Sequence, residues 1–293
     1  MSRTIAFIGL GAMGRPMARR LVEQQFCVQG FDLNAEALAA HAANGGVACS
    51  SATEAAKDAE ALILMVVNAA QARAALVTSG ALEALKSDAL VILMATCSPA
   101  DAREIAGMVE KAGRRFLDAP VSGGVVGAEA GTLTIMAGGP KAVFDAANTY
   151  LAPLGDKLYH VGDNAGDGAM VKTINQLLCG VHIAVTAEAF AMAEKAGLDT
   201  GLLLKILGQS AAASWMINNR GPRMLEIEPE VTSAVDIFVK DLSLVLDAGR
   251  SAKVALPIAA VAHQMFLASS GAGHGLADDS QVIRAYRALN GTI

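Results

Sequence analysis

Aromatic and charged residues are scarce in this 293-residue chain. Phenylalanine, tryptophan and tyrosine make up 4% of the residues, charged residues make up 17%, and the formal net charge is −5. The basic residues are scattered, and none of their runs is longer than Arg19-Arg20 or Arg114-Arg115. Nucleic-acid-binding surfaces need clustered lysine and arginine, so we expect no nucleic-acid partner.

Cysteine and histidine are few and are not spaced as metal ligands. The five histidines show no ligand spacing, and no C-x-x-C pair occurs among the four cysteines, Cys27, Cys49, Cys97 and Cys179. Three of the cysteines fall in segments that we expect to be buried, where a thiol behaves as a small apolar side chain. We therefore predict neither disulfides nor a metal site.

Long apolar runs are also missing. The run at residues 61–67 is among the longest, whereas a helix needs about 20 residues to cross a bilayer. The first residues carry one basic side chain, Arg3, and a short apolar run that stops at a glycine-rich turn, which is unlike a secretory signal peptide. We predict a cytoplasmic protein without a membrane partner.

The first half of the chain alternates short apolar runs with amphipathic stretches. We expect helices at residues 13–24 and 35–43, and strands at residues 4–8, 28–31, 61–67, 90–95, 115–118, 132–137 and 157–161. The runs at 61–67 and 90–95 lack polar alternation, as do strands that helices cover on both faces. This pattern predicts a doubly wound parallel sheet, that is, an α/β Rossmann domain.

The second half of the chain has a helical texture throughout. Helices are expected at residues 170–196, 201–209, 237–253 and 257–269, and no convincing strand pattern occurs there. We therefore predict two domains, a Rossmann domain at residues 1–163 and an all-α domain at residues 164–293 that begins with a long connecting helix.

A glycine-rich turn follows the first expected strand. Its sequence, Gly9-Leu10-Gly11-Ala12-Met13-Gly14, is G-x-G-x-x-G between a strand and a helix, which is the context of a dinucleotide-binding turn. Asp32 ends the next strand, where a carboxylate can accept hydrogen bonds from ribose hydroxyls and repel a 2′-phosphate. These features predict NAD rather than NADP as the cofactor.

Two further strand ends should border that cofactor. Val67 ends the third expected strand and Thr96 follows the fourth, and ligands of such sheets bind outside the carboxyl ends of the strands. Thr96 could equally be a helix-capping residue. The spacing leaves both interpretations open.

The long helix of the second half carries a polar stripe. Lys172, Asn175, Gln176 and Cys179 stand at helical spacings that place them on one face. Lysine is rarely buried without a partner, so the stripe marks either a chemical site or the ordinary solvated face of the helix. Sequence alone does not decide between these two interpretations.

Two other segments could serve a site beside this helix. Ser122-Gly123-Gly124 follows an expected strand and could bind a carboxylate through backbone N–H groups, or could be an ordinary loop. The pair Lys240-Asp241 lies on a later helix, where such a pair is usually a solvated face.

Together these segments resemble the β-hydroxyacid dehydrogenase family, which includes 3-hydroxyisobutyrate dehydrogenases and tartronate semialdehyde reductases. The resemblance covers nearly the whole chain, and the segments occur in the order of the family. They are residues 9–17 (GLGAMGRPM), 118–124 (DAPVSGG), 166–172 (GDGAMVK) and 240–242 (KDL). Residues 66–71 and 119–131 also resemble the L-threonate dehydrogenase branch.

The resemblance implies oxidation of a small hydroxy acid, with Lys172 as the catalytic acid/base. It also implies a carboxylate cradle at Ser122-Gly123-Gly124, a substrate-orienting amide on Asn175, cofactor contacts from Thr96 and Lys240, and pairing of subunits through the helical domain as a homodimer or homotetramer. The family commonly has two asparagines where this chain has Asn175-Gln176, so we carry over no role for Gln176.

As a hypothesis, the neutral amine of Lys172 accepts the proton of the hydroxyl while hydride moves to NAD. Partial burial and a neighbouring cation such as Lys240 would lower the pKa of that amine from its ordinary value of about 10.4.

Three alternatives compete with this hypothesis. The first is an NADPH-dependent reductase of an aldehyde acid such as tartronate semialdehyde, glyoxylate or succinic semialdehyde, against which Asp32 argues. The second is an imine reductase, which generally lacks the lysine found at Lys172. The third is a non-catalytic dinucleotide-binding module, which would not need the lysine, the asparagine and the Ser-Gly-Gly turn together.

Overall fold

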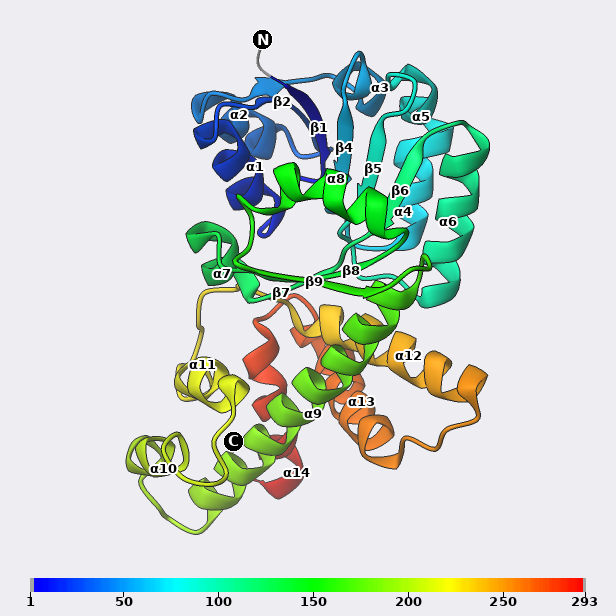
Figure 1. Ribbon diagram of the computed structural model, residues 1–293. Helices are drawn as coiled ribbons and strands as arrows, with labels where there is room; N and C mark the ends of the chain where they lie inside the picture. Colours follow the sequence, from blue (N-terminus) through cyan, green and yellow to red (C-terminus); the bar gives the residue numbers. More distant parts are fainter. Residues whose placement is uncertain (1–2, 292–293) are drawn as a thin grey trace. The chain divides into compact units, whose positions relative to one another are not determined.

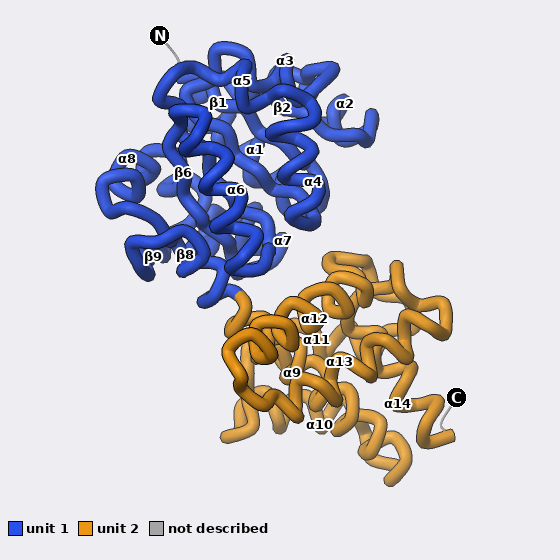
Figure 2. Tube along the Cα trace, turned by 90° about the vertical axis from the view of Figure 1, so that its right-hand side faces the viewer, with its two compact units in different colours: residues 1–172 blue, residues 173–293 orange. Residues whose placement is uncertain are grey.

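The computed structural model describes residues 3–291, which form the helices and strands drawn in Figure 1. They divide into two compact units, residues 1–172 and residues 173–293 (Figure 2). The division falls inside the long helix α9, Asp167–Lys195, whereas the sequence places the domain boundary just before that helix. The first turns of α9 belong to the first unit because they pack on its sheet.

The first unit is built around one sheet. Its strand order is β3-β2-β1-β4-β5-β6-β8-β7, and β9 pairs with β8. The strands are β1 (Thr4–Ile8), β2 (Cys27–Phe31), β3 (Val47–Ala48), β4 (Ala61–Leu64), β5 (Leu90–Leu93), β6 (Arg115–Asp118), β7 (Val121–Ser122), β8 (Thr134–Gly138) and β9 (Lys157–Gly162). All pairings from β3 to β6 are parallel, which confirms the doubly wound sheet. The pairings of β8 with β6 and with β7 are antiparallel, which the sequence did not predict.

Helices cover both faces of this sheet (Figure 1). Side chains of a strand alternate between faces, and in β1 Ile5 and Phe7 join one buried apolar cluster while Ala6 and Ile8 join another. The absence of polar alternation follows from burial on both sides. The helices are α1 (Gly14–Glu23), α2 (Ala35–Ala43), α3 (Ala52–Ala56), α4 (Ala69–Arg73) with η1 (Ala74–Thr78), α5 (Ala81–Ala84), α6 (Pro99–Lys111), α7 (Gly124–Ala130) and α8 (Lys141–Leu151).

Two strands are shorter than expected. β4 ends at Leu64 rather than at residue 67, and β5 ends at Leu93 rather than at residue 95. After β4 the chain turns to start a helix, because the side chain of Asn68 accepts a hydrogen bond from the backbone N–H of Gln71 and caps α4. Apolar residues beyond Leu64 therefore belong to a loop at the carboxyl edge of the sheet.

The second unit is helical, as predicted. Besides most of α9 it contains α10 (Thr200–Leu207), α11 (Trp215–Met224), α12 (Val235–Ala252), α13 (Pro257–Ser269) with η2 (Ser270–His274), η3 (Asp279–Val282) and α14 (Ile283–Asn290). Phe190 of α9 lies in its core, where Phe238 and Phe266 also pack with ring centroids 5.2 Å apart. Two ion pairs, Arg220–Asp279 and Arg223–Asp278, join α11 to the segment around η3.

By length and hydropathy, α9 is the one described helix that could cross a membrane. Its apolar residues Ile183, Ala187 and Phe190 are fully buried in the core of the second unit or nearly so. This burial is the pattern of a core helix in a globular domain.

Candidate active site

The glycine-rich turn between β1 and α1 leaves room for a phosphate group. Gly9 has φ +97°, and a Cβ there would lie 2.3 Å from the carbonyl oxygen of Met65. A Cβ on Gly14 would lie 1.8 Å from the carbonyl oxygen of Gly9, so both glycines are needed by the protein itself. A Cβ on Gly11 would meet nothing within 4 Å, so packing of the chain does not require glycine there.

The N-terminus of α1 lies at this turn, and in its first turn the N–H groups of Arg15 and Met17 donate to the carbonyl oxygens of Gly11 and Met13, while Pro16 has no N–H. Within residues 3–291 no side chain caps this helix at its N-terminus. Backbone N–H groups and the helix dipole at such an end favour a negative group. The residues of the turn, Gly9-Leu10-Gly11-Ala12-Met13-Gly14, therefore fit the pyrophosphate of a dinucleotide.

Asp32 follows β2 and is tied to the glycine-rich turn. Its Oδ2 accepts a hydrogen bond from the N–H of Leu10 at 2.6 Å, and its Oδ1 accepts one from the N–H of Asn34 at 2.8 Å. Each carboxylate oxygen can accept more than one hydrogen bond. Asp32 thus shapes the turn and retains the capacity to accept from ribose hydroxyls, and the sequence indicated only the second role.

Val67 and Thr96 both lie at the carboxyl edge of the sheet. Val67 is 49% exposed, and its N–H donates to Oε1 of Gln71 at 2.9 Å. The residue that caps α6 is Ser98, whose Oγ accepts a hydrogen bond from the N–H of Asp101. The alternative that Thr96 merely caps a helix is therefore wrong, and its contact with the cofactor stays a prediction.

The segment Ser122-Gly123-Gly124 joins β7 to α7 through two unusual backbone conformations. Gly123 has φ +136° and Gly124 has φ +64°, a region in which other residues are strained. A Cβ on Gly124 would meet nothing within 4 Å, so space lies open beside it. All three residues are half-buried, and this turn has the freedom to present N–H groups to a carboxylate.

The start of α9 packs directly on the ends of two strands. A Cβ on Gly168 would lie 2.4 Å from the carbonyl oxygen of Met136 in β8 and 2.8 Å from the carbonyl oxygen of Asp118 in β6. Lys172 stands four residues after Gly168, on the same face of the helix. This close approach brings Lys172 one helical turn away from the carboxyl edge of the sheet, where such folds bind their ligands.

The polar stripe of α9 is not its solvated face. Lys172 and Gln176 are each 7% exposed and Cys179 is 9% exposed, whereas Ile174 and Leu178 beside them are about half exposed, at 55% and 49%. The alternative of an ordinary wet face is therefore wrong. Apolar side chains point outward here and polar ones inward, which is the reverse of a surface helix.

Gln176 takes part in a buried network with α12. Its Nε2 donates to Oδ2 of Asp241 at 2.6 Å, and Nζ of Lys240 donates to Oδ1 of the same carboxylate at 2.5 Å. Asp241 is 2% exposed. The pair Lys240-Asp241 is thus not a solvated face, and the carboxylate compensates the charge of Lys240. Oδ1 of Asn175 accepts a weak hydrogen bond from the Sγ–H of Cys179, 3.7 Å away.

Sequence reasoning missed Asp118 as a functional candidate. This carboxylate ends β6 and is 1% exposed, and burial raises its pKa to about 7. Its Oδ2 accepts hydrogen bonds from the N–H groups of Gly166 and Ala169 at the start of α9. The available signal was an aspartate at the end of a buried strand, where ligands of such sheets bind.

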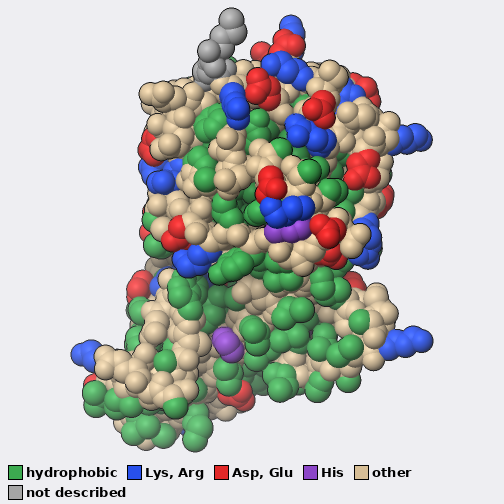
Figure 3. Space-filling view, in the orientation of Figure 1, with side chains coloured by type: hydrophobic (Ala, Val, Ile, Leu, Met, Phe, Trp, Pro, Cys, Tyr) green, Lys and Arg blue, Asp and Glu red, His purple; other side chains and the backbone are tan. Residues whose placement is uncertain are grey.

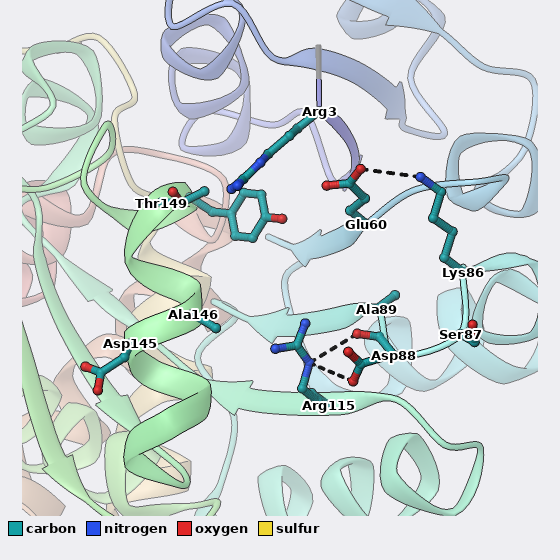
Figure 4. A pocket seen from close by; sticks show the side chains of 11 residues that line it. Arg3, Glu60, Lys86, Ser87, Asp88, Ala89, Arg115, Asp145, Ala146 and Thr149 are labelled. Atoms are coloured by element: carbon teal, nitrogen blue, oxygen red, sulfur yellow. Dashed lines mark hydrogen bonds and ion pairs between the residues drawn. The ribbon is translucent and has the colours of Figure 1, made fainter. Parts of the chain in front are cut away.

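A separate cleft of about 530 Å³ lies at the opposite edge of the sheet (Figure 4). Its lining comes from the amino ends of β1, β4, β5 and β6 and from α8. Lys86 pairs with Glu60 at 3.4 Å, and Arg115 pairs with Asp88 at 3.1 Å. These charges neutralise one another, and the cleft lies at the amino ends of the strands, away from the glycine-rich turn and Asp32 at the carboxyl ends. In the described part of the chain no group of three His, Cys, Asp or Glu side chains could hold a metal ion.

Comparison with known proteins finds a family match in each half of the chain. Residues 4–162 match the NAD-binding domain of 6-phosphogluconate dehydrogenase, and residues 166–286 match the NAD-binding domain of NADP-dependent 3-hydroxyisobutyrate dehydrogenase. The L-threonate dehydrogenase of Cupriavidus necator is 44% identical, over 98% of this chain and 97% of its own length. The 3-hydroxyisobutyrate dehydrogenase of Pseudomonas aeruginosa is 34% identical, over 97% and 98%.

Solved structures agree with these relatives. A crystal structure of 3-hydroxyisobutyrate dehydrogenase from Salmonella typhimurium is 40% identical and matches with a TM-score of 0.92, over 97% of this chain and 99% of that one. At this coverage the match includes both the Rossmann unit and the helical unit. The chain therefore belongs to the β-hydroxyacid dehydrogenase family, whose members are oxidoreductases that use a nicotinamide dinucleotide.

Proposed function

We propose that this protein oxidises the hydroxyl of a small hydroxy acid with NAD, and that Lys172 is its acid/base group. The observation that supports this most is the position of Lys172. It is 7% exposed and stands one turn beyond the glycine contact that anchors α9 to the carboxyl edge of the sheet. Lysine side chains are seldom this buried, and buried ionisable groups gather at functional sites.

In the proposed mechanism the substrate carboxylate sits on the N–H groups of Ser122-Gly123-Gly124, and the amide of Asn175 orients the substrate. The neutral amine of Lys172 accepts the proton of the reacting hydroxyl and becomes an ammonium group, while the C–H electron pair leaves as hydride and the C–O bond becomes a carbonyl. A nicotinamide dinucleotide held by the glycine-rich turn and Asp32 would supply the hydride acceptor. In the reverse direction the ammonium group of Lys172 returns the proton.

For the substrate we propose L-threonate or a related hydroxy acid such as 3-hydroxyisobutyrate. The support is the name of the Cupriavidus necator relative, which shares 44% of its residues with this chain over nearly the full length. We propose NAD rather than NADP because the carboxylate of Asp32 lies beside the glycine-rich turn and would repel a 2′-phosphate.

The test is a spectrophotometric assay at 340 nm with NAD and NADP against L-threonate, D-glycerate, 3-hydroxyisobutyrate, 3-hydroxypropionate and L-serine. We expect NADH formation with one acid, a rate that rises as a basic group loses its proton, and loss of turnover in Lys172→Ala. Lys205→Ala, which removes an exposed lysine of α10, is the matched control and should keep wild-type activity. Unimpaired turnover by Lys172→Ala would refute the role of Lys172.

We also propose that two or more copies associate through the helical unit. Leu178, Val185 and Met192 recur every seven residues on α9 and are 49%, 52% and 74% exposed, a spacing that suits helix–helix packing. In Figure 3, hydrophobic side chains gather on the visible face of the helical unit. Light scattering should give a dimer or tetramer, and Val185→Glu should weaken it.

We propose a cytoplasmic location because the described cysteines are free thiols. Three of the four cysteines are buried, and none is joined in a disulfide within residues 3–291. This location remains part of the proposal.

A further inference from the structure

In the buried carboxylate of Asp118, one oxygen accepts two hydrogen bonds and the other accepts none from the residues that the structure describes. Oδ2 accepts hydrogen bonds from the N–H of Ala169 at 2.7 Å and from the N–H of Gly166 at 3.1 Å. Oδ1 is buried and has no hydrogen-bond partner among the residues that the structure describes. A carboxylate that only stabilised the fold would ordinarily satisfy both oxygens, because an unsatisfied buried acceptor is costly.

Asp118 accepts from the N–H of Gly166, which directly precedes α9, and from the N–H of Ala169 in the first turn of that helix. The first N–H groups of a helix have no partner within the helix and are satisfied by caps. Here the cap comes from the end of β6, a different element, and the partners are 48 and 51 positions apart in sequence. The carboxylate therefore fixes the start of α9 to the sheet.

Lys172 follows this anchored turn directly. It lies three residues after Ala169 and four after Gly168, so its Cβ is placed by the turn that Asp118 holds. The backbone contact of Gly168 with the ends of β6 and β8 sets how close the helix comes. The hydrogen bonds of Asp118 fix the direction of these N–H groups. They thereby fix the rotation of α9 about its own axis, and this rotation decides where the side chain of Lys172 points.

We propose that Asp118 is the positioning residue for Lys172, and that it holds the start of α9 so that the lysine amine meets the reacting hydroxyl. This inference rests on the proposed function of Lys172. Asp118 acts through the helix and not by contact with substrate. A small displacement of a catalytic group, of the order of 1 Å, can lower the rate about a hundredfold.

The charge state of Asp118 adds a signature that a purely structural residue would lack. Burial raises the pKa of this carboxyl to about 7, and the nearby charge of Asp167 raises it as well, while the two backbone hydrogen bonds lower it. Above that pH the ionised carboxylate accepts both N–H groups strongly, and below it the acid accepts them weakly. The oxidation rate should therefore rise through pH 7, apart from any rise caused by Lys172.

The experiment compares wild-type protein with Asp118→Ala, Asp118→Asn and Lys172→Ala, at a temperature at which all are folded by circular dichroism. We expect Asp118→Ala to lower kcat at least tenfold with the Kd for NADH unchanged. Asp118→Asn should recover part of kcat, because one acceptor oxygen remains, and should lose the step near pH 7. Asp167→Asn is the matched control, since that carboxylate lies at the same helix end but bonds to Asn164 instead. It should keep the step and move it to lower pH, because the charge of Asp167 raises the pKa of Asp118.

The outcomes separate this inference from the proposed function. Wild-type kcat and an unchanged pH profile in both Asp118 variants, with Lys172→Ala inactive, would overturn the positioning role alone. A lower melting temperature with normal kcat would also overturn it, because that is the result of a structural role. Full turnover by Lys172→Ala would instead refute the proposed function itself.

Discussion

The glycine-rich turn allows a sharp test, because two of its glycines lack a side chain for different reasons. Gly14 lies where a Cβ would be 1.8 Å from the carbonyl oxygen of Gly9 and 3.2 Å from a ring carbon of Phe7. Gly11 lies where a Cβ would meet nothing within 4 Å. Gly14→Ala should therefore damage the fold, and Gly11→Ala should damage only the binding of the cofactor.

The expected magnitudes follow from these distances. Carbon and oxygen atoms ordinarily approach no closer than about 3.3 Å, so the backbone at Gly14 must shift by roughly 1.5 Å to admit a methyl group. Overpacking of this kind costs about 1–3 kcal/mol or more, which lowers the melting temperature by at least about 2–4 °C. In Gly11→Ala the free energy of unfolding should change by less than about 1 kcal/mol, while a methyl group at the pyrophosphate should weaken NADH binding at least about tenfold, or 1.4 kcal/mol.

The assay is thermal denaturation followed by circular dichroism, paired with fluorescence titration of NADH, for both variants and the wild type. The melting temperature should separate Gly14→Ala from the other two proteins, and the Kd for NADH should separate Gly11→Ala from the wild type. If Gly11→Ala bound NADH as tightly as the wild type, the backbone at Gly11 would not approach the cofactor, and the reasoning about the turn would be refuted.

Two further predictions concern a specificity residue and a buried ion pair. Asp32→Asn keeps an oxygen for the N–H of Leu10 but loses the negative charge. The preference for NAD over NADP, measured as the ratio of the two kcat/KM values, should therefore fall at least tenfold. An unchanged ratio would remove our argument for NAD. Arg220→Ala leaves the carboxylate of Asp279 buried without the guanidinium that binds both of its oxygens, and should cost about 3–5 kcal/mol in the free energy of unfolding. Burial raises the pKa of Asp279, so this cost should shrink as the pH falls and the carboxyl takes up a proton. Arg250→Ala, which breaks an exposed ion pair, is the control, and it should change the free energy of unfolding by about 0.5 kcal/mol or less. Urea denaturation measures both variants. An equal loss of stability in Arg220→Ala and Arg250→Ala would contradict the argument that burial makes the Arg220–Asp279 pair costly to break.

Much of the fold could be predicted because local patterns carry it. The helix at Ala35–Ala43 has Asn34 as its N-cap, and the helix at Pro257–Ser269 starts with proline, so their limits are as expected from sequence. In the first unit the helices α3 to α8 were not predicted, and in the second unit α11 and α14 were not. In α11, Pro222 and Gly221 obscure the helical pattern, and contacts with η3 stabilise the helix through buried ion pairs that are distant in sequence.

The candidate site was predicted only in part. The glycine-rich turn, Asp32 and Lys172 stand out in sequence because each breaks a local pattern or completes a motif. The roles of Asp118 and Gln176 do not, because each depends on a partner that is far away in the chain. Gln176 bonds to Asp241, 65 residues later, and Asp118 bonds to backbone groups about 50 residues later.

The sequence by itself determined the two kinds of unit, the dinucleotide-binding turn and the family, because periodicity and short motifs are local properties of the chain. Tertiary structure decided which face of α9 is buried, which carboxylate compensates Lys240 and which one caps the start of α9. The physical reason is that burial and pairing depend on what packs against a residue, and spacing along one helix is the same whether its polar stripe faces water or the interior.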